Sequence, residues 1–175
     1  MSASRIAQIT PKDLGILEKL LTSDYITGDQ IRTAIRKKIS TSQLVFASDI
    51  PEDVATIGSR IRFSANGLPT EERVLTWTVE SYPTGLALHV GTLRGLALLG
   101  QAAGASLGIP SDHKIERLDL RAVTYQPEAA SRKHPIGSVL SAHLQLKSQL
   151  EHNVENRPAG SPYWDDDNDP GPSAA

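Results

Sequence analysis

Apolar residues near the start of the chain recur at the spacing of a helix, because residues three or four apart share one helix face. Three leucines form the first such stripe: Leu14, Leu17 and Leu21. Thr10-Pro11 predicts where this helix begins, with a capping hydroxyl followed by proline at the first helical position. The period breaks at 22–29 and resumes through 31–39. The sequence therefore predicts two short helices packed as an antiparallel pair.

Farther along, apolar and polar residues alternate with the period of a strand. Five segments are predicted as strands: 43–47, 59–64, 72–80, 86–90 and 114–126. In the second of them Ile61 and Phe63 share one face, and the arginines between them share the other. Residues 92–99 are apolar without alternation, so we expect a short helix that Gly100 ends.

This pattern predicts an α+β fold. A short N-terminal helical hairpin, residues 1–41, precedes an antiparallel sheet domain with one packed helix, residues 42–129. In the remaining segment, 130–175, leucines predict a further helix over 138–152. The proline-rich, acidic residues 157–175 are expected to be disordered and outside the core, since they bury too little apolar surface to offset ordering entropy.

Charge is unevenly distributed, although the formal net charge is only −2. Residues 1–41 hold seven Lys/Arg and four Asp/Glu, a surplus of three positive charges. Four of these cations define a basic patch: Arg32, Arg36, Lys37 and Lys38. Such a patch is typical of a solvated helix face or of a surface that touches phosphate or an acidic protein. The negative total disfavours binding to free nucleic acid, since neutralised phosphates supply most of that affinity.

Composition excludes several classes of protein. The chain has no cysteine, which rules out disulfides, thiolate zinc sites and a cysteine nucleophile. Its longest apolar runs are too short to cross a bilayer, and residues 1–8 lack the apolar region of a signal peptide. We therefore expect a cytoplasmic protein without membrane contact.

Motifs that would support catalysis are weak. Gly104–Gly108 matches the G-x-S-x-G nucleophile elbow through Ser106, but that elbow needs a strand before the serine and a helix after it. The predicted order here is the reverse. Gly91–Gly95 lacks the Lys-Ser/Thr ending of a phosphate loop, and no two histidines have the i, i+4 spacing of a helical metal site. The sequence predicts no catalytic residue, no metal site and no cofactor.

Three motifs carry a resemblance to a known family. Gly95–Gly100, of sequence GLALLG, followed by Gly104, is similar to the G-x-A-L-L-G…G signature of the Gre-factor C-terminal domain. Thr124–Ala129 resembles the last strand end of that family's Rnk branch, the regulators of nucleoside diphosphate kinase. Ile50–Phe63 resembles the entry of that branch into its second strand. The chain thus resembles the Rnk-like branch over about residues 10–129.

The resemblance implies an FKBP-like domain behind a helical coiled coil, and binding to bacterial RNA polymerase core near its secondary channel. The residues that match the docking surface are Thr92, Leu93, Arg94, Gly95, Leu98, Leu99 and Gly100. The chain departs from the family's common Ser-Pro at Thr92-Leu93, and from its aspartate at Ala105. Indirect contact with DNA or RNA in the transcription complex and a monomeric state are also expected.

Arm length separates the functional hypotheses. Helices of about 11 residues span only about 17 Å, whereas a cleavage-stimulating Gre factor holds two acidic residues at the tip of a long coiled coil, where they help bind Mg²⁺. The tip here offers Asp24, Tyr25 and Asp29, and Asp29 also suits the N-cap of the second helix. We predict a polymerase-binding regulator that competes with Gre-type factors without cleaving RNA. The alternatives are a transcript-cleavage factor that uses Asp24 and Asp29, and a peptidyl-prolyl isomerase by fold analogy alone.

Overall fold

The computed structural model describes residues 6–23, 26, 28–78, 82–83, 85–111 and 114–133. All of them belong to one compact unit, Met1–Pro135, and a second unit, Ile136–Ala175, lies outside the described residues. The helix predicted over 138–152 and the acidic tail lie there as well. In the part of the chain that is described, no helix has the length and apolar character needed to cross a membrane.

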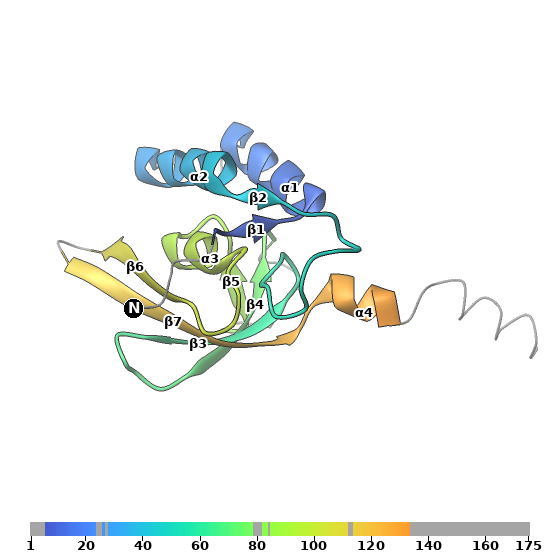
Figure 1. Ribbon diagram of the computed structural model, residues 1–175. Coiled ribbons are helices and arrows are strands. Elements are labelled where there is room, and N and C mark those ends of the chain that lie inside the picture. The colour runs from blue at the N-terminus through green and yellow to red at the C-terminus, as the bar shows by residue number, and fades with distance from the viewer. Residues whose placement is uncertain are drawn as a thin grey trace, which may run out of the picture. The chain divides into compact units, whose positions relative to one another are not determined.

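Helices α1 (Pro11–Thr22) and α2 (Asp29–Thr41) lie side by side (Figure 1). The predicted start of α1 is confirmed: the Asp13 N–H donates to Thr10 Oγ1 at 3.1 Å, and the Thr10 N–H donates to Asp13 Oδ2 at 2.9 Å. The prediction that Asp29 caps α2 is wrong. Gly28 is the N-cap and provides no side-chain bond, while Asp29 is already the first helical residue.

Two short strands connect these helices to the rest of the fold. Strand β1 (Gln8–Ile9) pairs in parallel with β2 (Gln43–Leu44). The backbone N–H of Gln8 also donates to the carbonyl of Gly100 at 2.8 Å. Strand β2 is shorter than the predicted 43–47, and its residues are exposed.

A curled five-stranded sheet forms the body of the unit, in the order β5-β4-β3-β7-β6. Its strands are β3 (Arg60–Ala65), β4 (Glu71–Thr76), β5 (Ala87–His89), β6 (Ser106–Ser111) and β7 (Lys114–Tyr125). The predicted all-antiparallel pairing is wrong at one edge, because β5 pairs in parallel with β4. The connection over 77–86 is long enough to return the chain before β5 begins. Strand β6 was not predicted, since its glycine and proline interrupt any alternation.

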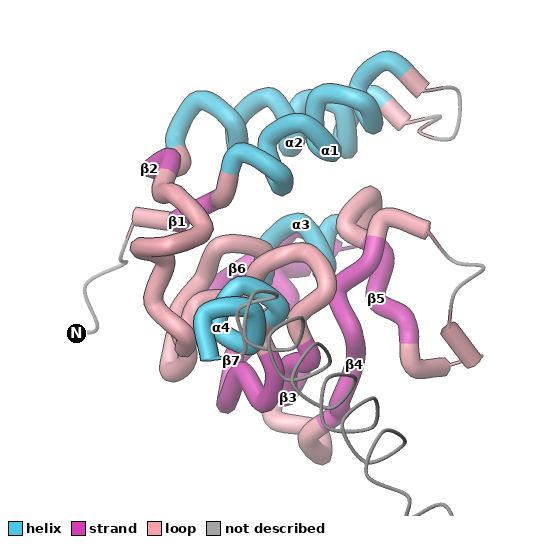
Figure 2. Tube along the Cα trace, turned by 90° about the vertical axis from the view of Figure 1, so that its right-hand side faces the viewer, coloured by secondary structure: helices cyan, strands magenta, loops and turns pink. Residues whose placement is uncertain are grey.

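Helix α3 (Leu93–Leu98) covers one face of this sheet, and α1 and α2 lie beyond α3 on the same side (Figures 1 and 2). The predicted alternation in β3 is confirmed, because Ile61 and Phe63 are buried in the core while Arg60 and Arg62 are exposed. Leu118 and Leu120 of β7 pack in the same core. The architecture is therefore a mixed α+β fold with its core between sheet and helices.

A fourth helix, α4 (Pro127–Lys133), follows β7 and was not predicted. Pro127, expected to close the last strand, instead opens a helix, which its fixed φ favours. Ala129 is buried at the predicted end of the domain, and α4 continues past it to Lys133. The buried Glu128 accepts a 2.6 Å hydrogen bond from Thr56 Oγ1, which ties α4 to the loop before β3.

Candidate functional site

The turn between β5 and α3 is held by a compact set of hydrogen bonds. Thr92 caps α3 by accepting from the Gly95 N–H at 3.1 Å, and its hydroxyl donates to the His89 carbonyl at 2.7 Å. His89 Nδ1 accepts from the Gly91 N–H at 2.9 Å, and Nε2 lies 2.6 Å from the Trp77 carbonyl oxygen. This arrangement assigns the proton of the neutral ring to Nε2.

Only part of the predicted docking set reaches the surface. Thr92 and Arg94 are exposed and Leu93 is half-buried. The remaining four are buried: Gly95, Leu98, Leu99 and Gly100. They support α3 from inside, and the surface that could meet a partner is confined to the first turn of the helix.

Both signature glycines have structural reasons. A Cβ at Gly95 would lie 2.2 Å from the His89 carbonyl oxygen, so no side chain fits there. Gly100 has φ 75° and ends α3, as predicted, and a Cβ on it would lie 2.7 Å from the Gln8 carbonyl oxygen. The left-handed backbone and the close approach of β1 both favour glycine.

Arg94 and Glu116 form an ion pair that the sequence did not reveal. Two guanidinium nitrogens of Arg94 donate to the two carboxylate oxygens of Glu116, at 2.6 and 3.0 Å. The Glu116 side chain is only 7% exposed and that of Arg94 is 47% exposed. This bond raises the pKa of Arg94 above its ordinary value. Strand β7 thereby positions the cation at the start of α3.

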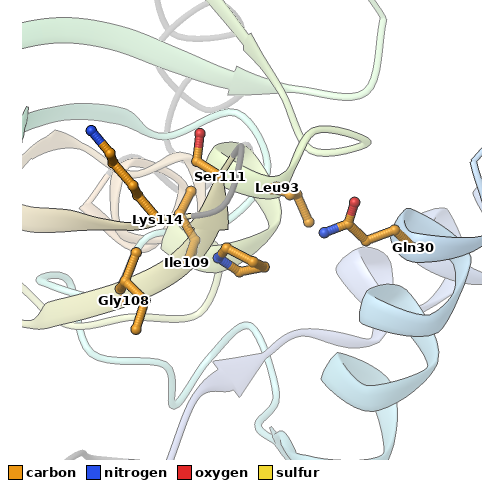
Figure 3. A pocket seen from close by; sticks show the side chains of 8 residues that line it. Gln30, Leu93, Gly108, Ile109, Ser111 and Lys114 are labelled. Atoms are coloured by element: carbon orange, nitrogen blue, oxygen red, sulfur yellow. The ribbon is translucent and has the colours of Figure 1, made fainter.

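A groove opens beside this pair, between the first residues of α2, the first turn of α3 and the β6–β7 hairpin (Figure 3). Its volume is about 790 Å³. The lining residues are Gln30, Leu93, Gly108, Ile109, Pro110, Ser111, Lys114 and Ile115. Ile115 is 79% exposed. The lining combines apolar side chains with a lysine, and Arg94 lines an adjoining pocket. This mixture is typical of a protein-binding surface.

The predicted basic patch is not a single surface. Arg32 donates to the carbonyls of Leu21 and Ile26 at 2.7 and 2.9 Å and so connects the two helices. Lys38 points toward α3, where its Nζ lies 3.3 Å from the Ala97 carbonyl oxygen, and burial lowers its pKa to about 8. The other two members, Arg36 and Lys37, are exposed.

Two residues of the predicted hairpin tip, Asp24 and Tyr25, lie outside the described residues. Asp29 is exposed at the start of α2. Within the described ranges, no group of three or more metal-binding side chains could hold an ion. The Ser106 hydroxyl donates to Asp119, and Ser106 opens a strand rather than a nucleophile elbow.

The chain is similar to known proteins in both sequence and fold. No protein-family model matches the chain. The chain is 29% identical over 128 residues to the "Regulator of nucleoside diphosphate kinase" of Escherichia coli K12, covering 70% of this chain and 91% of that protein. The protein of the same name from Shigella flexneri matches equally. A solved structure, "Prokaryotic transcription elongation factor GreA/GreB from Nitrosomonas europaea", superposes with a TM-score of 0.55 at 24% identity, covering 69% of this chain and 99% of that one.

The fold is therefore of the Gre-factor kind. The resemblance to the Rnk-like branch of the Gre-factor family, predicted from three short motifs, is confirmed by these relatives.

Proposed function

We propose that this chain is a transcription regulator that binds bacterial RNA polymerase core near the secondary channel and competes with Gre-type factors without cleaving RNA. Its similarity to the curated regulators supports a regulatory role, and its fold supports an origin shared with elongation factors. Control of a nucleoside diphosphate kinase, the role in the relatives' name, would then act through transcription, in the cytoplasm. The protein would not be an enzyme.

In this proposal α1 and α2 form a short antiparallel arm, residues 1–41, and residues 42–129 form an FKBP-like docking domain. The first turn of α3 would contact polymerase through Thr92, Leu93 and Arg94. The groove beside it supports this assignment, since Leu93 lines the groove and Arg94, held by Glu116, lines the adjoining pocket that Leu93 also lines. The four buried members of the set would act by fixing the position of that turn.

The observation that carries the proposal is the length of the arm. Helix α1 has 12 residues and α2 has 13, so they span about 18–20 Å at 1.5 Å per residue. Stimulated cleavage needs carboxylates delivered to a catalytic Mg²⁺. A short arm would occupy the docking site without delivering them. This steric argument favours competition over the alternative of a cleavage factor.

The test is competition for RNA polymerase core against a cleavage-competent Gre factor, followed by fluorescence, together with an RNA cleavage assay on stalled complexes. Displacement without cleavage is expected. The matched variants are Leu93→Ala, which alters the groove, and Leu68→Ala, which removes a leucine that is 62% exposed elsewhere. Leu93→Ala should weaken competition and Leu68→Ala should not. Cleavage that depends on Asp24 and Asp29, or absence of competition, would overturn the proposal.

A further inference from the structure

The face of the sheet opposite α3 is rich in arginine. Alternation along β3 and β7 directs four apolar side chains to the core and the residues between them outward; the four are Ile61, Phe63, Leu118 and Leu120. Four outward arginines form what we term the arginine face: Arg60, Arg62, Arg117 and Arg121. Their side chains are 57–69% exposed. Helices α1, α2 and α3 all lie on the other side of the sheet (Figures 1 and 2).

Two carboxylates are shared among these four cations. Glu72 lies 2.7 Å from Arg62 Nε and 3.8 Å from Arg60 Nε. Asp119 lies 3.1 Å from Arg117 and 3.6 Å from Arg121. Four positive charges against two negative ones leave a surplus of two on a chain whose total is −2.

Asp119 holds two of these arginines in place as an ionised carboxylate at neutral pH. Hydrogen bonds from Ser106 and Arg117 hold the pKa of Asp119 below its ordinary value, so this carboxylate remains ionised and keeps its two arginines in place. A guanidinium group has five N–H donors and each arginine shares its carboxylate with another. Donors are therefore left over for an external anion.

Register adds an aromatic residue to the same face. Arg60 is the partner of Tyr125 across β3 and β7, and residues directly opposite in an antiparallel pair point to one side of the sheet. Tyr125 is 50% exposed. The β3–β7 register shifts between Arg62 and Phe63, and Arg121 donates to Ser64 Oγ at 3.3 Å. The irregular ladder thus keeps Arg121 on the outward face.

We propose that the arginine face binds the phosphate backbone of single-stranded nucleic acid, with Tyr125 stacking on a base. Planar guanidinium groups match phosphate oxygens with two parallel hydrogen bonds. An open sheet that offers cations and an aromatic ring is typical of single-strand binding. An acidic peptide without aromatic residues would contact the cations but would offer no flat base for the ring to stack on. This binding is independent of polymerase docking, which the proposed function assigns to the opposite side of the sheet.

The test uses the full chain and a fluorescein-labelled single-stranded RNA of about 12 nucleotides, a length suited to one compact domain. Fluorescence anisotropy measures the dissociation constant at several salt concentrations, starting near 20 mM because the chain is acidic overall. The variant Arg62→Gln/Arg121→Gln is compared with Arg36→Gln/Lys37→Gln, which removes the same charge from α2. Circular dichroism verifies that each variant folds.

We expect the logarithm of affinity to fall linearly with the logarithm of salt, with a slope of about −0.7 for each phosphate contacted. Removing Arg62 and Arg121 should make this slope shallower by about 1.4, and the α2 control should leave it unchanged. Tyr125→Leu should weaken RNA binding at an unchanged salt slope. Three results would overturn the proposal. They are an equal loss of RNA affinity in both charge variants, displacement of the labelled RNA by oligoglutamate as effective as that by unlabelled RNA, and absence of RNA binding at low salt.

Discussion

Gly95→Ala tests whether the signature glycine is needed for packing. The added Cβ would lie 2.2 Å from the His89 carbonyl oxygen and 2.8 Å from its carbon. Overpacking costs about 1–3 kcal/mol, and a contact with backbone belongs at the upper end because no side chain can rotate away. Alanine recovers less than about 1 kcal/mol of helix propensity near a helix start. The free energy of unfolding should therefore fall by about 2 kcal/mol.

Gly15→Ala in α1 is the matched control. Its Cβ would meet nothing within 4 Å, so the better helix propensity of alanine should raise the free energy of unfolding by up to about 1 kcal/mol. Urea unfolding of the full chain, followed by far-UV circular dichroism, measures both variants. A Gly95→Ala protein as stable as the wild type would refute the reasoning, since the turn before α3 would then be free to move.

Three further predictions concern buried or bridging polar groups. Lys38 has a folded-state pKa of about 8, below its ordinary value of 10.5, so the unfolded chain binds more protons between these two pH values and the free energy of unfolding should rise from about pH 8 to 10.5. This rise should be on the order of 3 kcal/mol, and Lys38→Met should abolish it in urea titrations across that range. Thr56→Val leaves the buried Glu128 without its hydroxyl donor and should lower the unfolding free energy by about 1.5–3 kcal/mol. Arg32→Gln should accelerate amide exchange at the α1–α2 connection, whereas Arg36→Gln should not.

Much of the fold follows from local sequence rules. The threonine–proline cap of α1, the alternation of β3 and the glycine that ends α3 all act over a few residues, so pattern alone predicts them. The parallel strand β5 and the strand β6 depend on partners distant in sequence. Helix α4 was not predicted because a proline can either end a strand or start a helix. The contact that distinguishes the two here, between Glu128 and Thr56, is distant in sequence.

The candidate site was predictable only in outline. The sequence correctly predicted a helix at α3, but a motif does not distinguish an exposed residue such as Thr92 from a buried one such as Leu98. Arg94 was identified from the motif, yet its carboxylate partner lies 22 residues away on β7. Likewise, the charge count grouped Lys38 with its exposed neighbours, although helix geometry turns Lys38 toward α3. The outward arginines are divided between two strands, β3 and β7, that lie far apart in the sequence, so they form no run of charge.

The bonds made by the last described residues affect how the chain folds. Gln126 donates to the carbonyls of Pro51 and Val54, and Arg132 donates to those of Ala47 and Ile50. These bonds join residues 72–85 positions apart, so the loop before β3 gains these hydrogen-bond partners only after the end of β7 and α4 have been made. During synthesis, residues 1–133 must therefore all have emerged from the ribosome before these bonds can form. Contacts of such long range also slow folding relative to a helical bundle of equal size, and a chain terminated after β7 would leave that loop open to aggregation or proteolysis.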